Sequence, residues 1–177
     1  MNIICTGSLG LVGSTATRYF LDQGHAVIGV DNDMRRHFFG ENGSVAGNMI
    51  THGHYLHVGE DISKIERVFE EHEPDIIVHC AAQTSKEYAL KNPVLDFGIN
   101  AYGTVMLLEF MRKHVPNSVF ICVSGMMEEV SASKLCSDIM VEEYKKLFGL
   151  KVGVLRIESP KDIIHDLEVM IEILISA

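Results

Sequence analysis

Apolar runs and segments of helical periodicity alternate along almost the whole chain. The apolar runs are typical of strands buried inside a sheet, and they predict six strands, at Asn2–Thr6, His25–Val30, Tyr55–Val58, Ile76–Cys80, Ser118–Val123 and Val152–Leu155. The segments between them predict five helices, at Leu11–Gln23, Ser63–His72, Val94–His114, Ser131–Phe148 and Asp162–Ile175. The polar, glycine-bearing segment from Asn32 to Asn48 predicts a loop.

Alternation of strands and helices predicts parallel strands joined by right-handed crossovers. At 177 residues, the chain has the length of one domain. We therefore expect a single α/β domain of three layers, α/β/α, with a doubly wound parallel sheet formed by residues 1–156. Residues 157–177 are expected to form a C-terminal helix packed on the same domain. Its wide apolar stripe needs a partner, which either this domain or another subunit could provide.

A glycine-rich turn follows the first predicted strand and opens the first predicted helix. Its glycines are spaced three residues apart in Thr6-Gly7-Ser8-Leu9-Gly10-Leu11-Val12-Gly13. Glycines in this context permit a tight turn, close approach of backbone amides to a pyrophosphate, and close packing of helix on strand. The helix N-terminus also favours phosphate. The turn predicts a dinucleotide site of the Rossmann type, with contacts from Gly7, Leu9, Gly10, Leu11 and Val12. A glycine-rich turn without a ligand is the alternative.

Asp31 makes the dinucleotide interpretation stronger. It ends the second predicted strand, 18 residues beyond Gly13, where a carboxylate can accept hydrogen bonds from the adenosine ribose. The same carboxylate would repel the 2′-phosphate of NADP, so NAD is the expected cofactor. Asn32 and Arg35 are expected beside it, and Arg35 and Arg36 could soften the preference for NAD.

Composition and charge exclude several other classes. The net charge of −9 argues against a nucleic-acid partner, and no apolar run approaches the roughly 18 residues of a membrane span. Four scattered cysteines and the absence of a signal peptide predict a cytoplasmic protein without disulfides. His52 and His54 could face one side of a strand, but His57 would face the other, so no metal site is expected.

Three further segments extend the pattern set by the glycines. They are Gly59-Glu60-Asp61-Ile62, the segment Pro74–Gln83 that ends in Ala81-Ala82-Gln83, and Asn100-Ala101-Tyr102-Gly103-Thr104. Over about residues 1–156 the chain resembles the extended NAD-dependent epimerase/dehydratase branch of the short-chain dehydrogenase/reductase superfamily. Residues 31–36 and 81–83 are most similar to CDP-paratose (CDP-tyvelose) 2-epimerases. The resemblance implies further NAD contacts from Asp61, Ile62, Ala81, Ala82, Gln83, Asn100 and Lys134.

The resemblance also implies a chemistry that this sequence only partly retains. Family members oxidise a sugar carbon with a Tyr phenolate as base, a Lys four residues later, and an orienting Ser or Thr. Lys134 matches that Lys, but Val130 stands where the Tyr belongs. Ser124 is a weak match to the orienting hydroxyl, and only nine residues separate it from Lys134, fewer than in the family. The chain also ends soon after Arg156, where the family builds its sugar-nucleotide domain.

Three functions therefore remain open. The first is an NAD-binding module impaired in catalysis, and the second is an active nucleotide-sugar epimerase or reductase with a rebuilt site. The third is a structural or assembly module that binds no cofactor. Tyr88, Tyr102 and Tyr144 are the substitutes considered for the missing base, and a sugar nucleotide is a possible ligand. Helices 94–114 and 131–148 resemble those through which family members pair, so a homodimer is possible.

Overall fold

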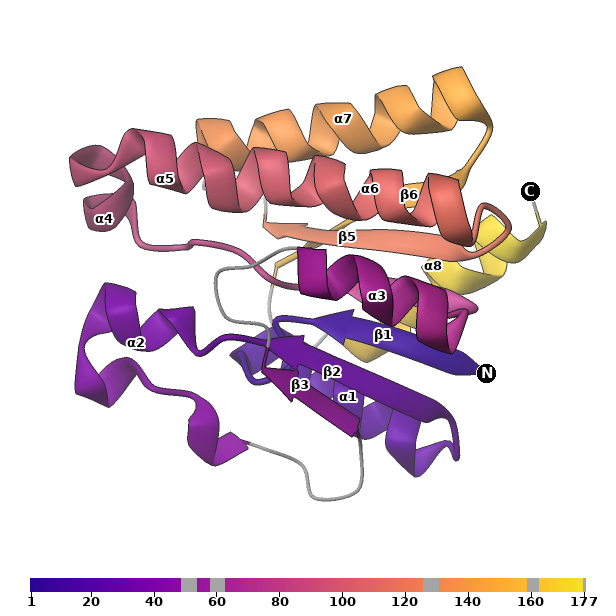
Figure 1. Ribbon diagram of the computed structural model, residues 1–177, viewed down its shortest axis with the longest axis horizontal. Helices are drawn as coiled ribbons and strands as arrows, with labels where there is room; N and C mark the ends of the chain where they lie inside the picture. Colours follow the sequence, from indigo (N-terminus) through magenta and orange to yellow (C-terminus); the bar gives the residue numbers. More distant parts are fainter. Residues whose placement is uncertain (49–53, 58–62, 126–130, 159–162, 177) are drawn as a thin grey trace.

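The fold is built on one parallel sheet of six strands (Figure 1). The structure, a computed structural model, describes residues 1–48, 54–57, 63–125, 131–158 and 163–176. The strands are β1 (Asn2–Thr6), β2 (Ala26–Asp31), β3 (His54–His57), β4 (Ile76–His79), β5 (Val119–Gly125) and β6 (Lys151–Ile157). Their order in the sheet is β3-β2-β1-β4-β5-β6. The predicted doubly wound parallel sheet is confirmed.

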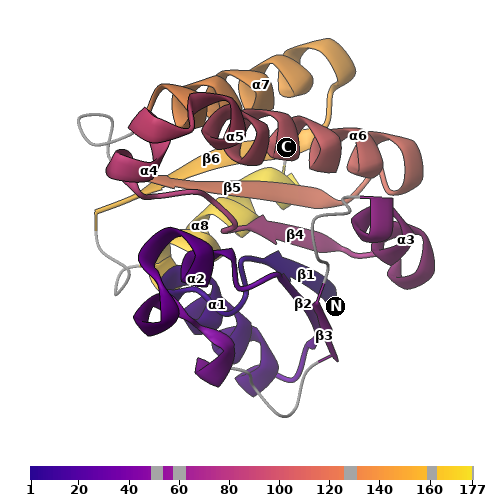
Figure 2. The ribbon, with the colours of Figure 1, turned by 60° about the vertical axis from the view of Figure 1, so that its left-hand side comes forward.

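Helices cover both faces of the sheet (Figure 2). The long ones are α1 (Leu11–Asp22), α3 (Ser63–His72), α6 (Gly103–His114), α7 (Ala132–Phe148) and α8 (Ile163–Ser176). On one face, α3, α6 and α7 bury a core that includes Phe69, Phe110 and Phe120. On the other face, α1 and α8 bury a second core that includes Phe20, Ile121 and Leu167. These two cores give the predicted three layers.

The strand order places a topological switch point between β1 and β4. From β1 the chain builds outward to β2 and β3, and it then returns to the other side of β1 for β4, β5 and β6. Thr6 pairs with His79 in the register of β1 and β4, so both strands end side by side. Ligands of open α/β sheets bind in the crevice outside such carboxyl ends.

The segment predicted as a loop between Asn32 and Asn48 contains helical turns, so that prediction was wrong in part. It holds α2 (Met34–Phe39) and two 3-10 turns, η1 (Glu41–Gly43) and η2 (Ala46–Asn48). No apolar periodicity marks them, because polar contacts hold the segment. The carboxylate of Asp33 accepts hydrogen bonds from the Ser44 hydroxyl, at 2.7 Å, and from the Val45 amide, at 2.8 Å.

The long helix predicted at residues 94–114 is a helix of mixed geometry. It begins as α5 (Pro93–Phe97), passes through the π-helical segment η3 (Gly98–Tyr102) and continues as α6. A separate short helix, α4 (Lys86–Lys91), precedes it. The hydroxyls of Thr104 and Ser137 both bond to the carbonyl oxygen of Asn100, at 2.7 and 2.9 Å. The π segment is therefore held by side chains that periodicity does not reveal.

The same helix is the one candidate for a membrane span in the described part of the chain. Pro93–His114 has the required length and a mean hydropathy of 1.2. Core helices pass this test as well, and Leu107, Leu108 and Met111 are buried in the core beside the sheet. Packing inside the domain thus explains the buried apolar side chains in the second half of this helix.

The C-terminal helix α8 packs on the sheet rather than extending away from it. Ile163, Leu167 and Leu174 belong to the core shared with α1 and β5. Gly153 on β6 lets the helix approach closely, because a Cβ there would lie 3.1 Å from the Met170 sulfur. Helix α8 therefore shares with α1 the core on that face of the sheet.

Candidate dinucleotide-binding site

The glycine-rich turn after β1 is packed so closely that side chains are excluded. Gly7 has a φ of +68°, and a Cβ there would lie 2.6 Å from the Ala81 amide nitrogen. A Cβ on Gly13 would lie only 2.1 Å from the Gly7 carbonyl oxygen. Two of the three glycines are thus required by close backbone contacts, one with the loop after β4 and one within the turn itself.

Hydrogen bonds tie the turn to the end of β2. The Gly7 amide donates to the Val30 carbonyl at 2.8 Å, and the Leu9 amide donates to Asp31 Oδ2 at 2.9 Å. Asp31 Oδ1 accepts from the Asp33 amide at 2.8 Å. Asp31, the residue predicted to bind the adenosine ribose, therefore lies directly beside the turn that is predicted to bind the pyrophosphate. Because a carboxylate has about four acceptor positions, the Asp31 side chain bonds to the turn and to the Asp33 amide at once and places its negative charge beside the turn.

The N-terminus of α1 offers donors at this turn. Gly10 is the N-cap of α1. Because glycine has no side chain, it cannot accept a hydrogen bond from the first backbone amides of the helix. The Ser8 hydroxyl is buried and has no hydrogen-bond partner among the described residues. Leu11 is exposed at the start of the helix. A glycine cradle with an orphaned hydroxyl and uncapped amides fits a pyrophosphate.

The remaining residues predicted to contact the cofactor on this side of the site, Asn32 and Arg35, lie just before and within α2. Asn32 Oδ1 accepts from the Met34 amide at 3.1 Å. The Arg35 guanidinium lies 4.6 Å from the centre of the Phe39 ring, and Arg36 pairs with Glu41 at 2.6 Å. Both arginines thus have partners within this segment.

The loop after β4 is fixed by a buried amide network. Gln83 donates through its backbone amide to Asn100 Oδ1 at 2.8 Å, and Asn100 Nδ2 donates back to the Gln83 carbonyl at 3.1 Å. Asp96 Oδ1 accepts from both side-chain amides, at 2.8 and 3.2 Å. Gln83 and Asn100 therefore hold Ala81 and Ala82 against the glycine turn.

A second polar network runs through the sheet beneath the crevice. Thr104 Oγ1 donates to the Asn100 carbonyl, so it accepts from His79 Nε2, which lies at 3.0 Å. His79 Nδ1 consequently accepts from Thr6 Oγ1 at 2.7 Å. Burial, reinforced by the positive charge of Lys134, lowers the pKa of His79 to about 3. His79 is therefore a neutral imidazole that links β1 and β4 to α6.

The residues expected for catalysis are occupied by internal contacts. Lys134 is buried, and its Nζ donates to the Val123 carbonyl at 3.1 Å. Ser124 Oγ donates to Asp138 Oδ2 at 3.1 Å, and the same oxygen pairs with Arg156 at 2.7 Å. Arg156 also donates to the Gly125 carbonyl at 3.1 Å. Asp138 and Arg156 thus hold the ends of β5 and β6 against α7.

The structure gathers most of the predicted site residues around the crevice at the switch point. The glycine turn, Asp31, Asn32 and the loop 81–83 meet there, while Asn100 lies behind that loop. Asp61, Ile62 and Val130 lie outside the described residues. Sequence reasoning missed Thr6, His79 and Asp138, although a polar residue at the end of an apolar strand was a usable signal for the first two.

Comparisons with known proteins agree with this geometry. A sequence model described as "NAD dependent epimerase/dehydratase family" matches residues 3–160. Protein CapI of Staphylococcus aureus is 27% identical over 180 residues, which cover 88% of this chain and 53% of CapI. CDP-paratose 2-epimerase of Salmonella typhi is 30% identical over 148 residues, which cover 82% of this chain and 40% of that enzyme.

Solved structures give the same result. UDP-glucose 4-epimerase of Thermotoga maritima, determined with UDP-glucose, has a TM-score of 0.75 and 26% identity. The match covers 88% of this chain and 55% of the epimerase chain. UDP-glucose 4-epimerase of Thermus thermophilus, in complex with NAD, has a TM-score of 0.72 and 25% identity, with coverages of 88% and 54%. The chain spans about half the length of these relatives. It belongs to the NAD dependent epimerase/dehydratase family.

Proposed function

We propose that this chain binds NAD in the crevice between the glycine turn and the loop after β4. The observation that carries the proposal is the backbone packing of Gly7 and Gly13, where a Cβ would lie 2.6 Å and 2.1 Å from backbone atoms. Such packing brings uncapped helix amides to the surface where a pyrophosphate would lie. The orphaned Ser8 hydroxyl offers one more group to the cofactor.

The position of Asp31 supports NAD over NADP. Its carboxylate lies 2.9 Å from the Leu9 amide, so its negative charge lies at the adenosine end of the crevice. Arg36 is paired with Glu41, and the Arg35 guanidinium lies over the Phe39 ring, so the positive charge of Arg36 is partly balanced within this segment. The 2′-phosphate of NADP would therefore meet repulsion.

We further propose that the chain lacks the family's sugar oxidation. Val130 has no ionisable group at the position of the catalytic Tyr. Tyr144 is a poor substitute, because burial and its hydrogen bond to Glu109 raise its pKa to about 12. The Tyr88 hydroxyl is bonded to His37 at 3.0 Å, and Tyr102 is exposed on the outer side of the helix. None of these three tyrosines is thus placed as an evident substitute base.

Lys134 is the residue of the catalytic set that the sequence retains. Its ammonium has three donors, of which one bonds to the Val123 carbonyl and one to Cys122 Sγ at 3.9 Å, so a third remains for the nicotinamide ribose. We propose that Lys134 contacts the cofactor, and the experiment below tests whether a rebuilt site supports catalysis.

The four cysteines are all unpaired thiols, which supports a reducing compartment such as the cytoplasm.

The test is a calorimetric titration of purified chain, stripped of nucleotide, with NAD and then NADP. Asp31→Asn removes the charge but keeps an acceptor for the Leu9 amide, and it should weaken NAD binding about tenfold, as expected for a lost charge-assisted hydrogen bond. Asp22→Asn is the matched control, because Asp22 ends α1 roughly 18 Å from the turn at 1.5 Å per residue. This control should bind NAD like the wild type.

A second arm separates binding from chemistry. The chain loaded with NAD is mixed with UDP-glucose or a CDP-sugar, and NADH is followed by its absorbance. We expect no NADH and no epimerised sugar. Turnover abolished by Lys134→Met would establish a rebuilt active site instead. Failure of a folded wild-type chain to bind either nucleotide would leave only a structural or assembly role.

A further inference from the structure

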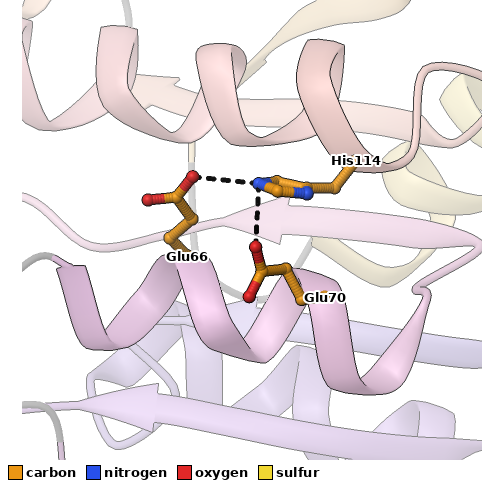
Figure 3. A group of neighbouring side chains, drawn as sticks. All are labelled: Glu66, Glu70 and His114. Carbon is orange, nitrogen blue, oxygen red and sulfur yellow. Dashed lines mark hydrogen bonds and ion pairs between the residues drawn. The ribbon is translucent and has the colours of Figure 1, made fainter.

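Three side chains that could hold a metal ion meet outside the crevice, between α3 and α6 (Figure 3). Glu66 and Glu70 lie one helical turn apart on α3, so their carboxylates share one face of that helix. His114 is the last residue of α6, just before the chain enters the amino end of β5. The site is therefore at the opposite end of the strands from the dinucleotide crevice.

The distances between the donor atoms suit a small divalent ion. His114 Nε2 lies 2.9 Å from Glu66 Oε1 and 3.6 Å from Glu70 Oε1, and all three atoms lie within 4.8 Å of one another. Zinc bonds to nitrogen and oxygen ligands at about 2.0–2.1 Å, so tetrahedral ligands are separated by about 3.3–3.4 Å. The two distances from His114 bracket that separation.

The helices beneath these side chains are packed against each other in the core. Phe69 and Phe110, each in the same helical turn as a donor residue, pack edge to face in the core with ring centres 5.9 Å apart. Exposure rises across the set, from 15% for the His114 side chain to 27% for Glu66 and 50% for Glu70. A bound ion would thus be held from the protein side and open to solvent on the other.

We propose that Glu66, Glu70 and His114 form a binding site for Zn²⁺ or a similar divalent transition metal, with a water or an outside ligand completing the shell. The donor chemistry selects this class, because imidazole with carboxylates suits zinc, whereas magnesium and calcium prefer oxygen ligands alone. Two carboxylates and a neutral imidazole also balance the +2 charge of the ion. The site is independent of the proposed NAD function.

Substitution of Lys113 distinguishes a metal site from a plain cluster of ion pairs. Its Nζ lies 2.6 Å from Glu66 Oε1, and its side chain is largely exposed, so it can swing away. In a metal site the Lys113 ammonium competes with the ion, and Lys113→Met should strengthen zinc binding several-fold. In a plain ion-pair cluster, where a protonated His114 bridges the two carboxylates, removing Lys113 creates no zinc affinity.

The experiment is a titration of the full chain, treated with a chelator, with Zn²⁺ alone, and with Co²⁺ for its visible spectrum. Glu70→Gln and His114→Gln should each weaken zinc binding at least tenfold and remove the spectrum of bound Co²⁺. Glu71→Gln is the matched control, because Glu71 neighbours Glu70 but pairs with Arg67, and it should bind zinc like the wild type. Glu70 is half exposed, so its variant is expected to fold, and a thermal melt without metal checks this.

Equal zinc affinity in the wild type, Glu70→Gln and His114→Gln would overturn the proposal, since any zinc would then be bound elsewhere. Absence of zinc binding to the wild type would overturn it as well. Loss in both variants, retention in Glu71→Gln and a gain in Lys113→Met would establish the site. None of these outcomes depends on NAD.

Discussion

Gly13 approaches the carbonyl oxygen of Gly7 so closely that a Cβ on Gly13 would lie 2.1 Å from it. Because the obstructing atom belongs to the backbone, the turn itself must open to admit a side chain. Gly13→Ala should lower the free energy of unfolding by roughly 2–3 kcal/mol and weaken NAD binding. Urea unfolding and calorimetry measure the two effects.

Gly98→Ala is the control for that substitution. Gly98 has helical angles, with φ −59° and ψ −43°, and a Cβ there would meet nothing within 4 Å. Alanine should therefore leave stability unchanged or raise it by up to about 1 kcal/mol. Equal stability of the Gly13→Ala and Gly98→Ala proteins would contradict the packing described for the turn.

His79 should make stability depend on pH. The unfolded chain protonates this imidazole near its ordinary pKa of 6.5, whereas the folded chain does so only near 3. Between those values the unfolded state binds more protons, so the free energy of unfolding falls as the pH falls, by up to about 1.4 kcal/mol per unit. Denaturation at several pH values should show a shallower slope for His79→Gln than for the wild type. An unchanged slope would show that His79 titrates freely in the fold.

The ion pair between Asp138 and Arg156 should contribute to stability. Asp138 is buried, and Arg156→Met would remove the positive charge that pairs with its carboxylate, leaving the hydrogen bond from the Ser124 hydroxyl. We expect Arg156→Met to lower the free energy of unfolding by about 3 kcal/mol, measured by urea unfolding. Arg67→Met, which breaks the exposed pair with Glu71, should have little measurable effect. Similar effects of the two substitutions would contradict a structural role for the buried pair.

We propose helices 94–114 and 131–148 as the surface for the homodimer that the family resemblance makes possible. Ile139 on α7 is 61% exposed, and a two-fold interface would bury it against its own copy. Ile139→Arg should convert the dimer to a monomer, as measured by light scattering after size exclusion. Ile173→Arg on α8 is the control, because Ile173 is 57% exposed on the other side of the sheet. A monomeric wild type would remove this surface from consideration.

The sequence predicted the sheet well, because strands buried on both faces are largely apolar, and β4 and β5 are apolar up to the polar residues at their carboxyl ends. It also predicted the glycine turn, since close backbone contacts leave only glycine at Gly7 and Gly13. It did not predict α2 or the π segment, because the segment of α2 is held by hydrogen bonds to the Asp33 carboxylate and the π segment by one from the Thr104 hydroxyl, which periodicity does not reveal. The set of Glu66, Glu70 and His114 was hidden for another reason: His114 lies 48 residues from Glu66, and only the packing of α3 on α6 brings them together.

The most direct test of the central claim is an NMR titration of the chain, labelled with ¹⁵N, with NAD. We predict that the amide signals of Leu9, Gly10 and Leu11 at the start of α1, and of Asp31, move first and saturate together. Asp31→Asn should require more NAD to reach the same shifts. Signals that stay unmoved at millimolar NAD, or that move only away from this crevice, would contradict the assignment of this chain as an NAD-binding protein.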